Sequence, residues 1–207
     1  MVPALNQLSA AILAATTIGL VSIGSAQATP MTYTFTGSGA GLADGSAFSG
    51  AFSFVFTADS SAIDSSGPPF FRLTNVAGTF TEGAFSATLT PTVTIVATAD
   101  PTLPRINFFN ATFDNGLGLQ DSAVDSYDLS TAIGPITVTA PGTDTSFLTP
   151  TFGGGSFAAV GGGSVSLTSD ESLTFTAAVL PVPEPLSLGI FGASLAGLGL
   201  LRRRKTP

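Results

Sequence analysis

The strongest constraint on the fold is a two-residue alternation in the middle of the chain. From Ala47 to Thr57 the even positions are Phe48, Gly50, Phe52, Phe54 and Phe56, whereas the odd positions carry Ala, Ser, Val or Thr. Successive side chains of a β-strand point to opposite faces, so this pattern predicts a strand with one aromatic, buried face and one small or hydroxylic face.

The same alternation recurs between Thr29 and Pro181, with Gly, Pro, Asp and Asn at the breaks. It covers residues 32–36, 77–81, 84–90, 92–98, 105–113, 136–140, 155–159, 164–168 and 172–179. Convincing helical spacing is absent from this region. Many short strands separated by turn residues predict a single all-β domain of about 150 residues, an antiparallel β-sandwich-like fold.

The tripeptide Thr-Phe-Thr occurs at residues 34–36, 79–81 and 174–176. Their irregular spacing argues against a solenoid, so we attribute them to the shared strand pattern.

The C-terminal segment predicts a membrane topology. A Val182-Pro183-Glu184-Pro185 motif precedes an uncharged run from Leu186 to Leu201, which is followed by Arg202, Arg203, Arg204 and Lys205. As a helix the run would span roughly 24 Å, and the flanking basic side chains can snorkel to the membrane surface. The basic cluster should stay on the cytoplasmic side, which places the preceding chain outside.

This order and spacing resemble the PEP-CTERM sorting tail of exported bacterial proteins, and the resemblance covers residues 182–207. It implies that Pro183, Glu184 and Pro185, with Val182, form a motif recognised by an integral-membrane exosortase. The run from Leu186 to Leu201 would be a temporary anchor and Arg202–Lys205 the stop-transfer cluster. It also implies delivery to the cell surface or biofilm matrix, usually in Gram-negative bacteria. An ordinary permanent anchor is the alternative.

The N-terminus predicts a secretory signal over residues 1–28. An apolar stretch from Leu8 to Ile23 leads to Ala26-Gln27-Ala28, a pattern that suits signal peptidase cleavage before Thr29 after entry into the Sec translocon. The first basic residue is Arg72, so the positive charge ahead of the apolar stretch is limited to the terminal amine. The alternative is a buried N-terminal helix of the domain.

The predicted exported region is strongly acidic. Between Thr29 and Pro181 twelve acidic residues face only Arg72 and Arg105, a net charge of about −10, against −7 for the whole chain. Such a surface repels phosphate backbones and anionic headgroups, so we exclude nucleic acid as a partner.

Composition narrows the chemistry. The chain has no Cys, His or Trp, so it lacks disulfides, thiolate nucleophiles, imidazole bases and Cys/His zinc sites. Two carboxylates alone can support glycoside hydrolysis, but the Trp and His that usually line sugar subsites are missing. We therefore predict a non-enzymatic protein without a cofactor.

One acidic loop is a weak candidate for a metal site. Asp121, Asp125 and Asp128 could offer oxygen ligands to calcium, yet their spacing matches no EF-hand, and a solvated loop is the simpler interpretation. The glycine triplets at 153–155 and 161–163 lack a following Lys and predict turns rather than phosphate loops.

Together these features predict a secreted or cell-surface structural or interaction protein. The expected partners are exosortase, signal peptidase, extracellular polysaccharide and, during export, the inner membrane. The alternative is a calcium- or carbohydrate-binding adhesin module held permanently by the C-terminal helix.

The sorting motif can be tested without touching the hydrophobic run. In a host that carries an exosortase, Glu184→Ala should leave the anchor attached and hold the protein in the inner membrane, because the processing enzyme has lost its charged recognition point. Immunoblotting of a tag placed after Pro207 measures this directly. A tag that stays joined to unaltered protein at the cell surface would establish permanent anchoring instead.

Overall fold

The computed structural model describes residues 29–113, 116–139, 146–148 and 156–181. The strands are β1 (Pro30–Ala43), β2 (Ser46–Asp59), β3 (Asp64–Gly67), β4 (Phe70–Glu82), β5 (Phe85–Thr98), β6 (Arg105–Phe109), β7 (Gly116–Gln120), β8 (Ile133–Thr139), β9 (Ser146–Leu148), β10 (Phe157–Ala158) and β11 (Ser164–Val179). Two 3₁₀ turns, η1 (Ser60–Ala62) and η2 (Ser122–Val124), interrupt them.

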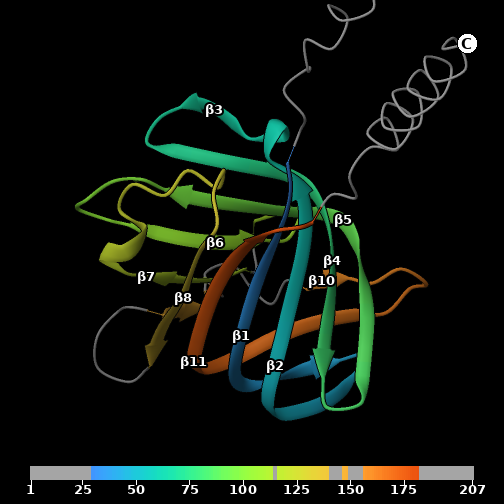
Figure 1. Ribbon diagram of the computed structural model, residues 1–207. Helices are drawn as coiled ribbons and strands as arrows, with labels where there is room; N and C mark the ends of the chain where they lie inside the picture. The colour runs from blue at the N-terminus through green and yellow to red at the C-terminus, as the bar shows by residue number, and fades with distance from the viewer. Residues whose placement is uncertain (1–28, 114–115, 140–145, 149–155, 182–207) are drawn as a thin grey trace, which may run out of the picture.

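All of these strands belong to one antiparallel sheet that curls until it nearly closes (Figure 1). The order along the sheet is β10-β11-β1-β2-β4-β5-β6-β7-β9, with β3 paired to β4 and β8 paired to β11. The short β10 pairs with β11, and a bridge between Ala159 and Leu89 brings this end of the sheet back to β5. The prediction of an all-β antiparallel domain is therefore confirmed.

The long strands β4 and β5 bend, so that each belongs to both layers of the sheet. In Figure 1, β4 and β5 pass from the layer of β11, β1 and β2 into the layer that contains β6 and β7. Their pairing is interrupted between Leu73 and Val76, where Asn75 adopts a φ of 58°, and again between Val76 and Gly78. Such bulges bend a strand and increase its twist, which lets one sheet enclose a core on its concave side.

The centre of the core is the aromatic face of β2. Phe52, Phe54 and Phe56 are at most 3% exposed, as the alternation predicts. The ring of Phe54 packs against those of Phe80 and Phe108 at centroid distances of 4.9 and 4.7 Å. Aromatic pairs of this kind add about 0.5–1.5 kcal/mol each to the free energy gained by burial.

Glycines on the neighbouring strands make room for these rings. Gly37 pairs with Phe52 and Gly78 pairs with Phe56, and a Cβ at either glycine would collide with the ring opposite. Gly41 stands in the same relation to Phe48. The sequence pattern predicts a break at the glycines after Thr36, but β1 continues through them to Ala43, because they lie on the inward face beneath the rings.

The segment between β7 and β8 closes the open side of the core. Val124, Tyr127 and Leu129 are buried in the same hydrophobic cluster as the strands. The Tyr33 hydroxyl donates to the Leu129 carbonyl at 2.7 Å, and the Tyr127 hydroxyl donates to the Thr131 carbonyl at 3.1 Å. Burial raises the pKa of both phenols far above the ordinary value, so both stay neutral hydrogen-bond donors at physiological pH.

Several strands differ from the sequence-based expectations. A strand was expected over 105–113, but β6 ends at Phe109. Asn110–Phe113 forms a turn, closed by the Phe113 N–H donating to the Asn110 carbonyl.

The strand β7 was not expected, because the glycines at 116 and 118 are typical of turns. In β7 they alternate with the buried Leu117 and Leu119. Pro91 was taken as a break between two strands, yet it lies inside β5 where the ladder to β4 is already interrupted, so its missing N–H costs no ladder bond.

The three Thr-Phe-Thr tripeptides have a structural explanation. Phe35, Phe80 and Phe175 all point into the core and are 0% exposed. The flanking threonines point outward, and those of β1 and β11 are direct cross-strand partners: Thr34 with Thr176 and Thr36 with Thr174. Two of these tripeptides are thus neighbours on adjacent strands, and the third lies in the same sheet on β4, with β2 between it and β1.

Both ends of the domain leave from one place. Met31 pairs with Val179, and the Leu180 N–H donates to the Pro30 carbonyl at 2.9 Å. The predicted signal, with Ala26 and Ala28, and the whole predicted tail, with the motif 182–185, the run 186–201 and the cluster 202–205, lie outside the described residues. Within the described residues no helix is long and apolar enough to cross a bilayer.

The aromatic core of β2 is testable by truncation. Phe54→Ala should lower the free energy of unfolding by about 3–5 kcal/mol, because a fully buried ring leaves a cavity among well-packed neighbours. Ser53→Ala, on the outward face of the same strand, should change it by less than about 0.5 kcal/mol. Urea denaturation followed by circular dichroism measures both, and equal effects of the two changes would show that this face is not the core.

Candidate functional site

The most distinctive surface feature is a hollow of about 430 Å³ on the convex side of β4, β5 and β6. We call it the arginine hollow, because both arginines of the region from Thr29 to Pro181 line it. Its lining residues are Pro69, Phe70, Arg72, Val96, Thr98, Asp100, Leu103, Arg105, Asn107, Phe109 and Phe113.

Strand register places the lining residues in two rows across the sheet. Phe70, Thr98 and Arg105 are successive cross-strand partners on β4, β5 and β6. Two residues further along, Arg72, Val96 and Asn107 form the next row. The alternation that turns Ile95, Ile106 and Phe108 into the core turns these residues outward, so core packing and the hollow depend on the same register.

The two loops beside the sheet complete the walls. Leu103 is 39% exposed and Phe113 is 51% exposed, so apolar surface remains open to solvent at the rim. The Phe113 ring lies 5.5 Å from that of Phe109. Exposed aromatic and aliphatic groups around a few polar ones are typical of small-molecule sites.

The charged groups of the hollow are held by local contacts. The Arg72 guanidinium lies over the Phe70 ring at 5.6 Å, and Arg105 Nε donates to Gln120 Oε1 at 3.2 Å. Asp100 Oδ1 accepts from the hydroxyl of Thr102 at 2.7 Å and from its backbone N–H at 2.8 Å, which lowers the pKa of that carboxyl. Two cations and one carboxylate of the described residues therefore line the hollow, in a domain whose overall charge is strongly negative.

Asn107 adds an unsatisfied acceptor. Its side chain is 6% exposed, and its Oδ1 is a buried side-chain atom without a hydrogen-bond partner. The oxygen lies over Gly118 of β7, where a Cβ would collide with it. A buried acceptor without a partner costs about 1–3 kcal/mol, so the Asn107 oxygen at the wall of the hollow would gain from a donor.

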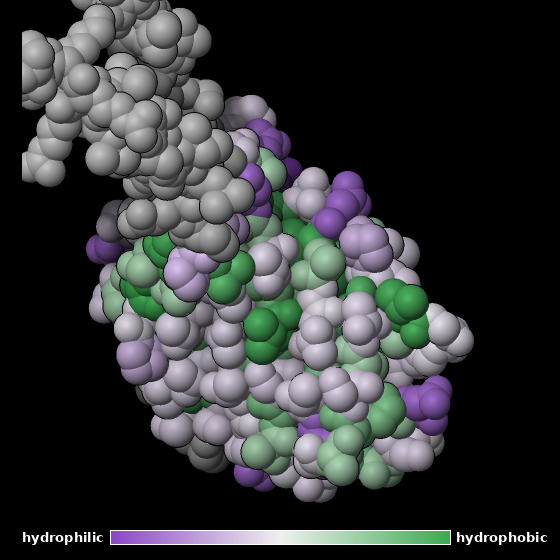
Figure 2. Space-filling model, turned by 45° about the vertical axis from the view of Figure 1, so that its right-hand side comes forward, coloured by the Kyte–Doolittle hydropathy of each residue, from purple (hydrophilic) through white to green (hydrophobic). Residues whose placement is uncertain are grey.

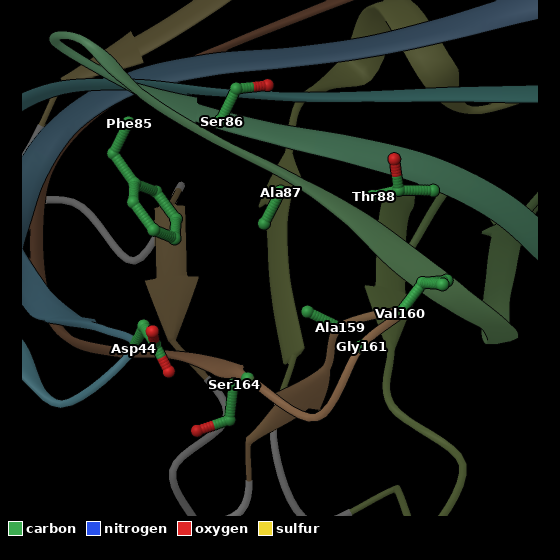
Figure 3. Close-up of a pocket in the computed structure, with 10 residues that line it drawn as sticks. Asp44, Phe85, Ser86, Ala87, Thr88, Ala159, Val160, Gly161 and Ser164 are labelled. Carbon is green, nitrogen blue, oxygen red and sulfur yellow. The ribbon is translucent and has the colours of Figure 1, made fainter.

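A second hollow of about 410 Å³ lies between the start of β5 and the turn after β10 (Figure 3). Phe85 and Ala87 point into it, whereas the hydroxyls of Ser86 and Thr88 point away. Of the described residues that line it, Asp44 alone is charged. The turn at Gly161 and Gly162, where φ is 98° and 103°, bears out the prediction that this glycine triplet is a turn. With few converging polar groups, this hollow is the weaker candidate.

The outward side of the sheet from β8 to β5 forms a third feature, which we call the hydroxyl face. One row across it consists of the cross-strand partners Thr137, Thr174, Thr36, Ser53, Thr81 and Ser86. The next row is Thr176, Thr34, Val55, Thr79 and Thr88. The broad pale surface in Figure 2 has the near-neutral hydropathy expected of such side chains. Neighbouring rows lie roughly 6.6 Å apart and neighbouring strands about 4.8 Å apart.

The acidic loop of the sequence analysis uses its carboxylates locally. Asp121 Oδ1 accepts from the Ala123 N–H at the start of η2, and Asp128 Oδ1 accepts from the N–H and the hydroxyl of Ser130. Asp125 follows η2. Among the described residues, no group of three or more acidic side chains is close enough to hold a metal ion.

Arg72 and Arg105 are the two basic residues between Thr29 and Pro181, but their positions in the sequence do not predict that they lie together. The sequence of β6 shows an alternation in which Arg105, Asn107 and Phe109 are separated by the apolar Ile106 and Phe108. This alternation marks the outward face of the strand. The convergence with Arg72 depends on the strand order β4-β5-β6, which no local pattern encodes.

Comparison of the chain with models of known protein families, with curated protein sequences and with solved structures finds no significant match.

The calcium hypothesis is testable by thermal melting of the purified protein. The midpoint should be the same in excess calcium and in chelator, because the Asp121 and Asp128 carboxylates already accept hydrogen bonds from their own turns. A bound ion would stabilise the folded state by roughly 2.7 kcal/mol at a hundredfold excess over its dissociation constant. A calcium-dependent rise that disappears in Asp125→Asn would contradict the expectation.

Proposed function

We propose that this chain is the precursor of an exported, non-enzymatic surface or matrix protein whose β-domain binds extracellular polysaccharide. In this proposal residues 1–28 are a signal helix removed after passage through the Sec translocon. The tail from Val182 resembles a PEP-CTERM segment, with the run 186–201 as a membrane helix that exosortase later removes. The organism would be a Gram-negative bacterium with an extracellular matrix.

The observation that supports matrix binding best is the hydroxyl face. Its two central rows contain Thr, Ser and Val only, so no charged group within them must lose its hydration when a neutral polymer is bound. Hydroxyls both donate and accept hydrogen bonds, and the threonine methyls can pack against the C–H faces of sugar rings. A neutral polysaccharide is the polymer that such a face matches.

The position of the chain ends is compatible with this route. Because Pro30 and Leu180 meet through a backbone hydrogen bond, one pole of the domain would face the membrane while both ends are still attached. The hydroxyl face lies along the flank of β1 and β11 rather than at that pole, so a matrix polymer could reach it before or after tail removal.

The non-enzymatic part of the proposal is supported by the side chains that are present. Without His or Cys, catalysis would need carboxylates or phenols, and both tyrosines donate to backbone carbonyls inside the core. Among the described residues, each of the two hollows is lined by one carboxylate, whereas glycoside hydrolysis ordinarily needs two flanking the scissile bond.

Affinity electrophoresis of the full-length protein in gels containing neutral β-glucans or α-glucans tests this binding. We expect retardation by at least one neutral glucan, and at least tenfold weaker retention after Thr36→Glu combined with Thr81→Glu, because two desolvated carboxylates oppose binding. Both threonines are exposed, so the fold should tolerate these changes.

Thr131→Glu combined with Ala132→Glu is the matched control, since it introduces the same number of exposed carboxylates in the loop between β7 and β8, outside the hydroxyl face. The proposal fails if no neutral glucan retards the protein, or if the control weakens retention as much as the substitutions on the face.

A further inference from the structure

The arginine hollow differs electrostatically from the rest of the domain. Both basic residues between Thr29 and Pro181 lie in its lining, together with the carboxylate of Asp100. Strand register places the two arginines diagonally across β5, in neighbouring rows of the same face. Arg72 is also the cross-strand partner of Asp64 on β3, so a carboxylate lies beside it outside the hollow.

The contacts of each arginine orient its guanidinium. Arg105 is held through Nε by Gln120, its own cross-strand partner on β7. Arg72 is stacked over Phe70. Guanidinium groups restrained in this way lose little further freedom when they bind a carboxylate, which they can contact through two parallel hydrogen bonds.

The remaining lining groups are suited to a sugar ring. Phe70 and Phe113 are 40% and 51% exposed and offer apolar faces that can cover ring C–H groups. Asn107 Oδ1 lacks a donor, and a ligand hydroxyl could supply one if the amide turned from Gly118 toward the hollow. A volume of about 430 Å³ is sufficient for one or two sugar rings.

We propose that the arginine hollow binds a hexuronic acid, with Arg72 and Arg105 contacting the ligand carboxylate, the exposed phenylalanines covering the ring, and Asn107 accepting from a ring hydroxyl. This site is separate from the hydroxyl face and recognises a different chemical class, an anionic sugar rather than a neutral polymer. It also gives an acidic domain a local attraction for an anionic ligand, which falls with rising ionic strength.

Isothermal titration of the full-length protein with sodium glucuronate tests the proposal, with glucose, acetate and sulfate as comparison ligands. Glucuronate should bind saturably, and each comparison ligand at least tenfold more weakly, because glucose lacks the carboxylate and the other anions lack the ring. Arg72→Gln and Arg105→Gln should each weaken glucuronate binding at least tenfold. Thr131→Glu is the control, since it lowers the net charge by the same amount outside the hollow and should leave the affinity unchanged.

Two further variants separate recognition from folding. Phe113→Ser alters an exposed side chain and should weaken binding severalfold with an unchanged circular dichroism spectrum. Arg72→Lys keeps the charge but removes the planar fork, so its affinity should fall between those of the wild type and Arg72→Gln.

The proposal is overturned if glucuronate does not bind or if glucose binds equally well. It is also overturned if acetate or sulfate matches glucuronate, which would mean a general anion patch. Retention on neutral glucans is measured separately, so failure of this site would leave the hydroxyl face untouched, and the reverse holds equally.

Discussion

The packing of the β2 phenylalanines over glycines of the adjacent strands is the contact on which the rest of this structure depends. A ring pointing inward from Phe52 or Phe56 can lie flat against the neighbouring strand only because Gly37 or Gly78 has no side chain there. This arrangement fills the core with aromatic area in a chain that has no Trp. It also sets the register of β1, β2 and β4, since a shift by one residue would turn every ring toward water.

That register has consequences on the opposite side of the sheet. With the phenylalanines inward, the intervening threonines and serines face outward, and antiparallel pairing aligns them into the rows of the hydroxyl face. The same reasoning applies where β4 and β5 bend into the layer of β6 and β7. There the inward residues Ile95, Ile106 and Phe108 leave Arg72, Arg105 and Asn107 on the convex side. Both proposed binding surfaces are thus the outward side of the same inward–outward alternation, on two different parts of one curved sheet.

Much of the fold was predictable from local patterns, and the exceptions share a cause. The β2 alternation correctly placed Phe52, Phe54 and Phe56 on one buried face. Glycine was misleading on β1 and β7, where it was read as a turn residue but serves as space beneath Phe48 and Phe52 or beside Asn107. Whether a glycine ends a strand or accommodates a neighbour depends on the residue opposite, which a single sequence does not identify. The acidic loop was visible too, but the use of Asp121 and Asp128 as turn acceptors depends on local geometry.

The sequence by itself determined the strand-rich character of the domain, its acidity, the absence of thiol and imidazole chemistry, and the predicted export and sorting signals at its ends. These properties depend on composition or on residues close together along the chain. Only the tertiary structure decided that three distant Thr-Phe-Thr segments lie in one sheet, that Arg72 and Arg105 line one hollow, and that Pro30 and Leu180 leave the domain together. The physical reason is that strand order is set by which hydrophobic faces close best around a shared core. That closure sums contacts over the whole chain, and no local segment encodes it.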